Sequence, residues 1–223
     1  MSKKLFADAI TKILAGIIVL GLLIFLPAGT FFYSAGWILI TVLFIPMIIA
    51  GVIMMLKCPD ILARRLDAKE QQKEQGAVIK ISAFMFVSGF ITAGLDFRFG
   101  WSHLPEAITV IAVIIFVISY ILYGEVIREN RYLSRTIKVE EGQRVADKGL
   151  YAIIRHPMYL STIFLFLSMP LILGSLYSFF IFLTYPFVIV KRIKYEEKLL
   201  FKELLGYSEY MEKVKYRLIP FIW

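Results

Sequence analysis

The sequence predicts an all-α membrane protein, a multi-span transmembrane bundle of four spans followed by a C-terminal helical hairpin. Two compositional observations predict this fold class. Of the 223 residues, 59% are apolar and only 19% are charged, whereas soluble domains carry roughly 25% charged residues. The apolar residues also occur in long runs, which soluble helices and strands do not need. A third observation, the distribution of basic residues, fixes the expected orientation.

Four runs are long enough to cross a bilayer, which takes about 20 apolar residues in a helix. They cover residues 9–26, 37–56, 78–95 and 107–127. Their charged residues, Lys12, Lys80 and Glu125, lie near the ends of the runs. A transporter would instead carry polar residues at mid-depth. The polar segment 58–75 that joins the second and third runs is either an amphipathic helix on the membrane surface or a plain loop.

Two shorter runs, 159–173 and 176–190, follow the four spans and are separated by Gly174 and Ser175. Each would be about 22 Å long as a helix, which is less than the thickness of a bilayer core. We therefore expect a tight helical hairpin, bent at Pro170 and Pro186.

Basic residues outnumber acidic ones by 25 to 17, which gives a net charge of +8. In this topology all of the basic residues except Arg98 fall on one side of the membrane. The positive-inside rule then places both termini in the cytoplasm. The charge is thus explained by membrane topology, and we expect no nucleic-acid partner. Cys58 is the only cysteine and His103 and His156 are the only histidines, which argues against a metal site built on cysteine or on several imidazoles.

The chain changes character near residue 127. Residues 1–127 consist of spans and connectors, and residues 128–223 carry the chemistry within one integrated domain. In the polar part, Pro157 forces His156 out of helical geometry and begins the next helix. Arg155 and His156 should then lie at a helix N-terminus, which can hold a carboxylate. Tyr159 could stack on a flat ring. Alternatively, Arg155 and His156 anchor the helix to lipid headgroups.

A second polar cluster follows the hairpin. Arg192 and Glu196 are four residues apart and therefore share one face of a helix. Taken alone, this spacing is more often an ion pair within the helix. Further on, Tyr207, Tyr210 and Tyr216 are the residue type that anchors a chain at the membrane interface.

The ordered set of motifs resembles the isoprenylcysteine carboxyl methyltransferase family, and most of all its bacterial branch. The resemblance covers residues 142–220. It consists of Gly-Leu-Tyr at 149–151, Arg-His-Pro-Met-Tyr at 155–159, the hairpin, Arg-x3-Glu-Glu-x2-Leu at 192–200, Gly-Tyr-Ser-Glu-Tyr at 206–210 and Leu-Ile-Pro at 218–220. A weaker similarity covers residues 94–101. Ser161 departs from the pattern, where glycine is common.

The resemblance implies an integral membrane enzyme with a cytoplasmic cofactor pocket for S-adenosylmethionine, released as S-adenosylhomocysteine. In the family, the cofactor contacts map to Gln143, Arg144, Val145, Ala146, Tyr151, His156, Pro157, Met158 and Tyr159. Arg155 joins these cofactor-binding candidates because of its expected place at the helix N-terminus. A glutamate after the hairpin also contacts the cofactor, and it maps to Glu196 or to its neighbour Glu197. The arginine near the substrate maps to Arg192. Arg192 and Glu196 are thus the catalytic candidates, in a multi-pass protein of the bacterial cytoplasmic membrane.

The expected reaction is methyl transfer to a lipophilic acceptor that reaches the site from the bilayer, foremost a carboxylate such as that of a prenylated cysteine. A carboxylate is already a nucleophile, so Arg192 would need only to hold it. A phospholipid or other small lipophile is an alternative acceptor. An amine acceptor would require a base such as Glu197 or Glu129. A second alternative is a sterol-type membrane reductase that uses NADPH.

Overall fold

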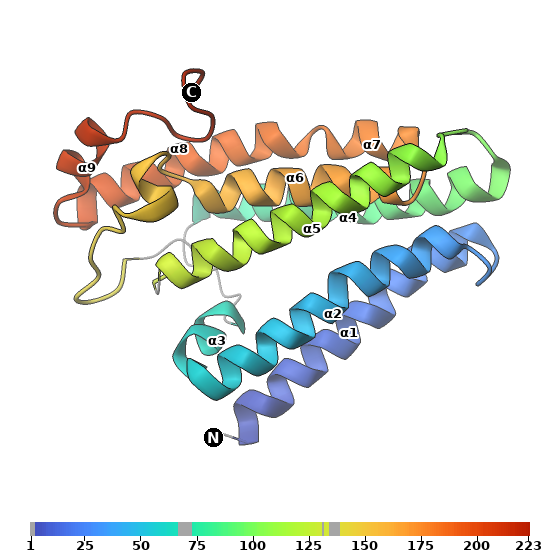
Figure 1. The fold of residues 1–223 in the computed structure, drawn as a ribbon, viewed down its shortest axis with the longest axis horizontal. Coiled ribbons are helices and arrows are strands. Elements are labelled where there is room, and N and C mark those ends of the chain that lie inside the picture. Colours follow the sequence, from blue (N-terminus) through green and yellow to red (C-terminus); the bar gives the residue numbers. More distant parts are fainter. Residues whose placement is uncertain (1–2, 67–72, 131, 134–138) are drawn as a thin grey trace.

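The computed structural model describes residues 3–66, 73–130, 132–133 and 139–223. Over these ranges the chain is all-helical and contains no strand (Figure 1). The predicted all-α class is confirmed. The four long apolar runs become the helices α1 (Lys3–Ala28), α2 (Ser34–Lys57), α4 (Lys73–Phe99) and α5 (Glu106–Glu129).

The predicted hairpin is formed by α6 (Pro157–Ile172), α7 (Leu176–Phe182) and α8 (Tyr185–Glu203). The chain reverses at Gly174, whose φ of 71° suits glycine. A short turn separates α7 from α8, and Pro186 lies in the first turn of α8. Pro170 lies inside α6, near its end.

The second arm of the hairpin is longer than predicted. With α7 it covers Leu176–Glu203, or 28 residues, whereas the apolar run ends at residue 190. The helix continues because Lys, Arg and Glu are good helix formers even where the sequence is no longer apolar. Among the described residues, five helices are long and apolar enough to cross a membrane, and α6 is a shorter apolar helix.

Three short elements complete the described chain. They are α3 (Pro59–Leu66), the 3-10 helix η1 (Gly149–Ala152) and α9 (Tyr207–Lys213). For the segment 58–75, a helix forms over Pro59–Leu66, while residues 67–72 lie outside the described residues. After α8, the helix α9 begins after the left-handed Gly206.

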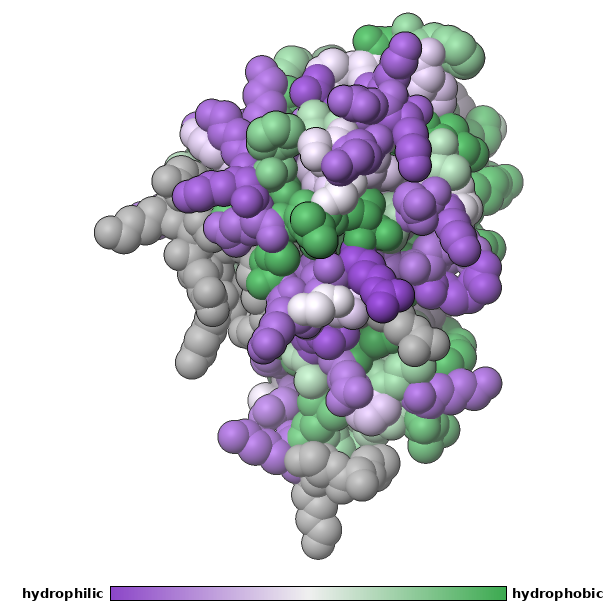
Figure 2. All heavy atoms as spheres, turned by 90° about the vertical axis from the view of Figure 1, so that its left-hand side faces the viewer, coloured by the Kyte–Doolittle hydropathy of each residue, from purple (hydrophilic) through white to green (hydrophobic). Residues whose placement is uncertain are grey.

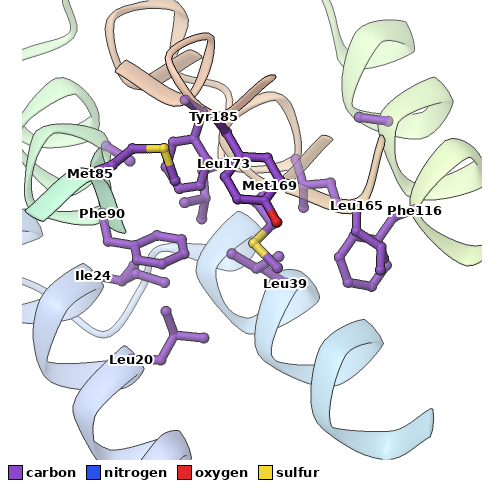
Figure 3. Packing of buried hydrophobic residues seen from close by; sticks show 14 of the residues in the cluster. Leu20, Ile24, Leu39, Met85, Phe90, Phe116, Leu165, Met169, Leu173 and Tyr185 are labelled. Carbon is purple, nitrogen blue, oxygen red and sulfur yellow. The ribbon is translucent and has the colours of Figure 1, made fainter. Parts of the chain in front are cut away.

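The core lies where α1, α2, α4, α5, α6, α7 and α8 meet, and its residues are almost all apolar. Figure 3 shows Ile24 and Leu39 facing Phe90 and Met169, which come from four different helices. Gly94 lets α4 approach the backbone of α1, because a Cβ there would meet the carbonyl of Ile24. Many apolar side chains nevertheless point outward from α1, α2 and α5, as expected for helices that contact lipid.

One end of the bundle gathers the polar elements. The end of α5, the start of α6 and the end of α8 lie there together with η1 and α9, on the left of Figure 1. Packing between α5 and α6 is the most extensive between any two described helices. The segments that the sequence assigns to chemistry are therefore brought together by the packing of apolar helices.

Candidate functional site

A cavity of about 800 Å³, part of which is open to solvent, lies at this polar end of the bundle. The cavity is lined by the residues Asn130, Tyr132, Leu133, Gln143, Arg144, Val145, Ala146, Tyr151, Arg155, His156, Met158, Tyr159, Arg192, Glu196, Leu200, Leu204, Tyr207 and Tyr210. Figure 2 shows this end of the molecule, where polar side chains gather over much of the surface.

The loop before α6 is held against the end of α5. Both carboxylate oxygens of Glu129 accept the backbone N–H of Leu150, at 3.1 and 3.0 Å. Gly149 has a φ of 58°, and a Cβ at this position would collide with the Glu129 carboxylate. Glycine is therefore required here by both conformation and space. This contact positions η1 and with it Tyr151.

Tyr151 links three elements of the cavity wall. Its hydroxyl accepts a hydrogen bond from Asn130 Nδ2 at 3.2 Å, and its carbonyl accepts one from the Tyr210 hydroxyl at 2.7 Å. Burial raises the pKa of both phenols, so both remain neutral at physiological pH. Tyr210 thus docks α9 onto η1.

Glu197 is buried behind the cavity and holds three cationic or potentially cationic side chains. Its Oε1 accepts Arg155 Nε at 2.8 Å and lies 3.3 Å from His156 Nε2, and its Oε2 accepts Arg217 Nε at 2.7 Å. Arg155 is itself buried and also donates to the carbonyl of Val214 at 2.7 Å. A buried charge needs such partners to be tolerated. Glu197 therefore fixes the orientation of Arg155 and His156, both of which line the cavity.

The segment after α9 completes this arrangement. The backbone N–H of Arg155 donates to the carbonyl of Tyr216, and that of His156 donates to the carbonyl of Arg217, both at 2.9 Å. His156 has a φ of −128° and precedes Pro157, the first residue of α6. The predicted non-helical geometry of His156 is confirmed.

The hydroxyl of Tyr159 joins the two catalytic candidates. Arg192 Nε donates to this hydroxyl at 2.9 Å, and the hydroxyl in turn donates to Oε2 of Glu196. Arg192 and Glu196 therefore share a face of α8, as their spacing predicts, and the phenol from α6 lies between them. The cavity wall thus presents a cation and a carboxylate whose relative position is set by a third residue.

Residues 107–202 match a family model described as the isoprenylcysteine carboxyl methyltransferase family. The matched region runs from α5 through most of α8 and contains Arg155, His156, Arg192 and Glu196. Over this region the chain is therefore similar to a family of methyltransferases. Its long apolar helices are those of an integral membrane protein.

Most of the residues that the sequence proposed for the site lie around this cavity. They are Gln143, Arg144, Val145, Ala146, Tyr151, Arg155, His156, Met158, Tyr159, Arg192 and Glu196. Pro157 and Glu197 are not among the residues that line it. Pro157 is fully buried at the start of α6, and Glu197 is engaged by Arg155, His156 and Arg217. Of the two adjacent glutamates, Glu196 faces the cavity.

Several lining residues were not expected from the sequence. Asn130 follows the fourth span directly, a position that could have suggested a role at the end of the helix. Leu200 ends the motif at 192–200 but received no role, although it follows Arg192 and Glu196 at four-residue spacing. Leu204 directly follows α8. Tyr207 and Tyr210 were expected at the interface, but they are buried in the cavity wall.

The cavity suits S-adenosylmethionine in the chemistry of its donors. Tyrosines provide flat apolar surfaces, Glu196 provides a carboxylate for a cationic group, and Arg192 provides a guanidinium group for a carboxylate. The Tyr207 hydroxyl is buried and has no hydrogen-bond partner within the described part of the chain. An unpartnered buried hydroxyl in a cavity wall suits a ligand with polar edges.

Proposed function

We propose that the protein transfers a methyl group from S-adenosylmethionine to a lipophilic carboxylate, such as that of a prenylated cysteine, at this cavity. The observation that carries the proposal is the arrangement of Arg192, Tyr159 and Glu196 on one wall. It offers a cation for an anionic acceptor beside a carboxylate for a cationic donor. The match of residues 107–202 to the methyltransferase family supports the methyl transfer itself.

The cofactor is assigned to the lining residues from the loop, η1 and the start of α6. They are Gln143, Arg144, Val145, Ala146, Tyr151, Arg155, His156, Met158 and Tyr159, together with Glu196. When bound, S-adenosylmethionine supplies the activated methyl group on a sulfonium. Pro157 and Glu197 serve this site indirectly, because one starts the helix and the other orients Arg155 and His156.

Arg192 is assigned to the acceptor. Its guanidinium can grip a carboxylate in a fixed geometry and hold it toward the reacting methyl group. Glu196 is assigned to a cationic or hydroxyl group of the cofactor. Tyr159 keeps these two side chains at a constant separation, because its hydroxyl hydrogen-bonds both. The protein then contributes mainly position and electrostatics.

The membrane setting is also part of the proposal. The cavity lies on the cytoplasmic side, both termini are cytoplasmic, and the α6–α8 hairpin enters the bilayer of a bacterial cytoplasmic membrane. The apolar side chains that α1, α2 and α5 expose support contact with lipid. The acceptor would approach laterally from the bilayer, and the soluble cofactor would approach from the cytoplasm.

The geometry favours a carboxylate acceptor over an amine. An amine must lose a proton, and the bases suggested by the sequence for this step are Glu197 and Glu129. Neither lines the cavity. Glu197 is engaged by Arg155 and Arg217, and Glu129 accepts the N–H of Leu150. A carboxylate acceptor requires no base.

Calorimetric titration of the purified protein in detergent tests the cofactor assignment. S-adenosylhomocysteine should bind with a stoichiometry of one, and NADPH should not bind. The reverse result would support the reductase alternative and overturn the proposal. Methyl transfer to prenylated cysteines and to amine-containing lipids then tests the acceptor. Transfer to amines alone, with a rate that rises with pH, would overturn the carboxylate assignment.

A further inference from the structure

Tyr207 differs from the other tyrosines around the cavity in how its hydroxyl is used. The residue begins α9 and is 4% exposed. Its hydroxyl is fully buried and finds no hydrogen-bond partner among the described residues. In contrast, the hydroxyls of Tyr151, Tyr159 and Tyr210 each have a partner from another element. Buried polar atoms in native proteins nearly always have a partner, so this hydroxyl requires an explanation.

The position of Tyr207 suggests that the partner is a ligand. The residue lines the same cavity as Arg192 and Glu196. The left-handed Gly206, with a φ of 83°, reverses the chain after α8, and Tyr207 then packs with Leu204 and Tyr210 in one apolar cluster. The apolar packing fixes the ring, and the hydroxyl is the part of the side chain left without a partner.

The surroundings of the hydroxyl indicate which chemical group it fits. Burial, and then the nearby Glu197 and Glu196 charges, raise the pKa of Tyr207, so the phenol is neutral and can donate. These two carboxylates disfavour an anionic ligand group beside it. Leu204 and Val145 make the adjoining surface apolar. A flat group with a neutral acceptor meets these conditions.

We propose that Tyr207 is a further cofactor-binding residue, whose hydroxyl hydrogen-bonds the uncharged nucleoside portion of S-adenosylmethionine. This inference rests on the proposed function. Tyr207 lies outside residues 107–202, the region that matches the family model, and the motif comparison assigns no contact to it. Tyr207 would act as a binding residue that contacts the cofactor directly.

The Tyr207→Phe variant tests this role, because it removes one oxygen and keeps the ring. Its affinity for S-adenosylhomocysteine, measured by calorimetry, should fall about 3- to 10-fold, the loss typical of one neutral hydrogen bond. The affinity for 5′-methylthioadenosine, which lacks the amino-acid portion, should fall by the same factor. Without ligand, the variant should unfold at the same temperature as the wild type or higher, because it no longer buries an unpartnered hydroxyl.

Tyr210→Phe is the matched control. Its hydroxyl donates to the carbonyl of Tyr151, so its loss should lower the unfolding temperature of the ligand-free protein. A Tyr207→Phe variant that binds S-adenosylhomocysteine as tightly as the wild type would overturn the inference. A lowered unfolding temperature of that variant would also overturn it, because the hydroxyl would then have a structural role. Failure of the wild type to bind S-adenosylhomocysteine would instead refute the proposed function.

Discussion

The two ends of the helical bundle each bury one carboxylate, and the partners of these carboxylates differ. Glu197 at the cavity end is 6% exposed and contacts Arg155, His156 and Arg217. Asp96 at the opposite end is 2% exposed. It accepts the backbone N–H and the hydroxyl of Ser102, both at 2.7 Å, and the hydroxyl of Ser175.

Burial alone therefore does not indicate what an acidic residue does. Ser102 and Ser175 belong to two loops, so Asp96 closes the end of the bundle by joining the connection after α4 to the hairpin turn. The partners of Glu197 include two side chains that line the cavity. Glu197 therefore orients side chains of the cavity wall, whereas Asp96 stabilises only the fold.

Among the variants that test this contrast, Glu197→Ala should produce the largest change, in both stability and cofactor affinity. It leaves Arg155 without its buried counter-charge, which costs roughly 3–5 kcal/mol of the free energy of unfolding. For a chain of this size, the thermal midpoint should fall by roughly 10 °C. Thermal unfolding in detergent measures this shift. Affinity for S-adenosylhomocysteine should fall as well, because Arg155 and His156 lose their orientation.

Glu196→Ala is the neighbouring control for stability. Glu196 faces the cavity and accepts a hydrogen bond from the Tyr159 hydroxyl. Its removal should change the midpoint much less than Glu197→Ala. If the two variants were equally stable, Glu197 would not organise this end of the bundle and the contrast between the two ends would be lost.

Arg192→Ala should have the second-largest effect, on catalysis instead of stability. Removal of one positioned donor from a reaction site typically costs about 100-fold in rate, so kcat/KM for the acceptor should fall by about that factor. The affinity for S-adenosylhomocysteine should stay close to that of the wild type. Assays with labelled S-adenosylmethionine give the rate, and calorimetry gives the affinity.

Arg192→Lys is the matched control, because it keeps the charge but loses the planar guanidinium. It should recover only a small part of the activity if a carboxylate is gripped at two points. Full recovery would reduce the role of Arg192 to that of a point charge. A large loss of cofactor affinity in Arg192→Ala would move this residue from the acceptor to the cofactor.

The sequence predicted the long helices well, because each must bury or expose to lipid a continuous apolar surface. It underestimated α8, whose charged last turns depend on the polar end of the bundle and not on hydropathy. The motif predicted Arg192 and Glu196 as residues on one face. Which of two adjacent glutamates faces a cavity depends on the rotation of α8. Packing against α4 and α6 sets this rotation, and the local sequence does not encode it.

The roles of Tyr207 and Tyr210 show a second reason for the missed residues. Tyrosine after a membrane span usually marks the interface, and this reasoning placed both residues there. Their burial depends on α9 folding back onto η1 through the bond between Tyr210 and Tyr151, a contact across 59 residues. Short sequence motifs carry no information about a contact between segments so far apart in the chain.

Asp96→Asn should have the smallest effect and gives the most direct test of the contrast between the two ends. The amide oxygen can still accept from Ser102, and the Ser175 hydroxyl can rotate to accept from the new NH₂ group. The loss in the free energy of unfolding should therefore be about 1 kcal/mol, the value of one hydrogen bond. Affinity for S-adenosylhomocysteine should not change. A change in affinity would mean that the Asp96 end is coupled to the cavity through the hairpin. The contrast between Asp96, which stabilises only the fold, and Glu197, which also orients cavity residues, would then be wrong.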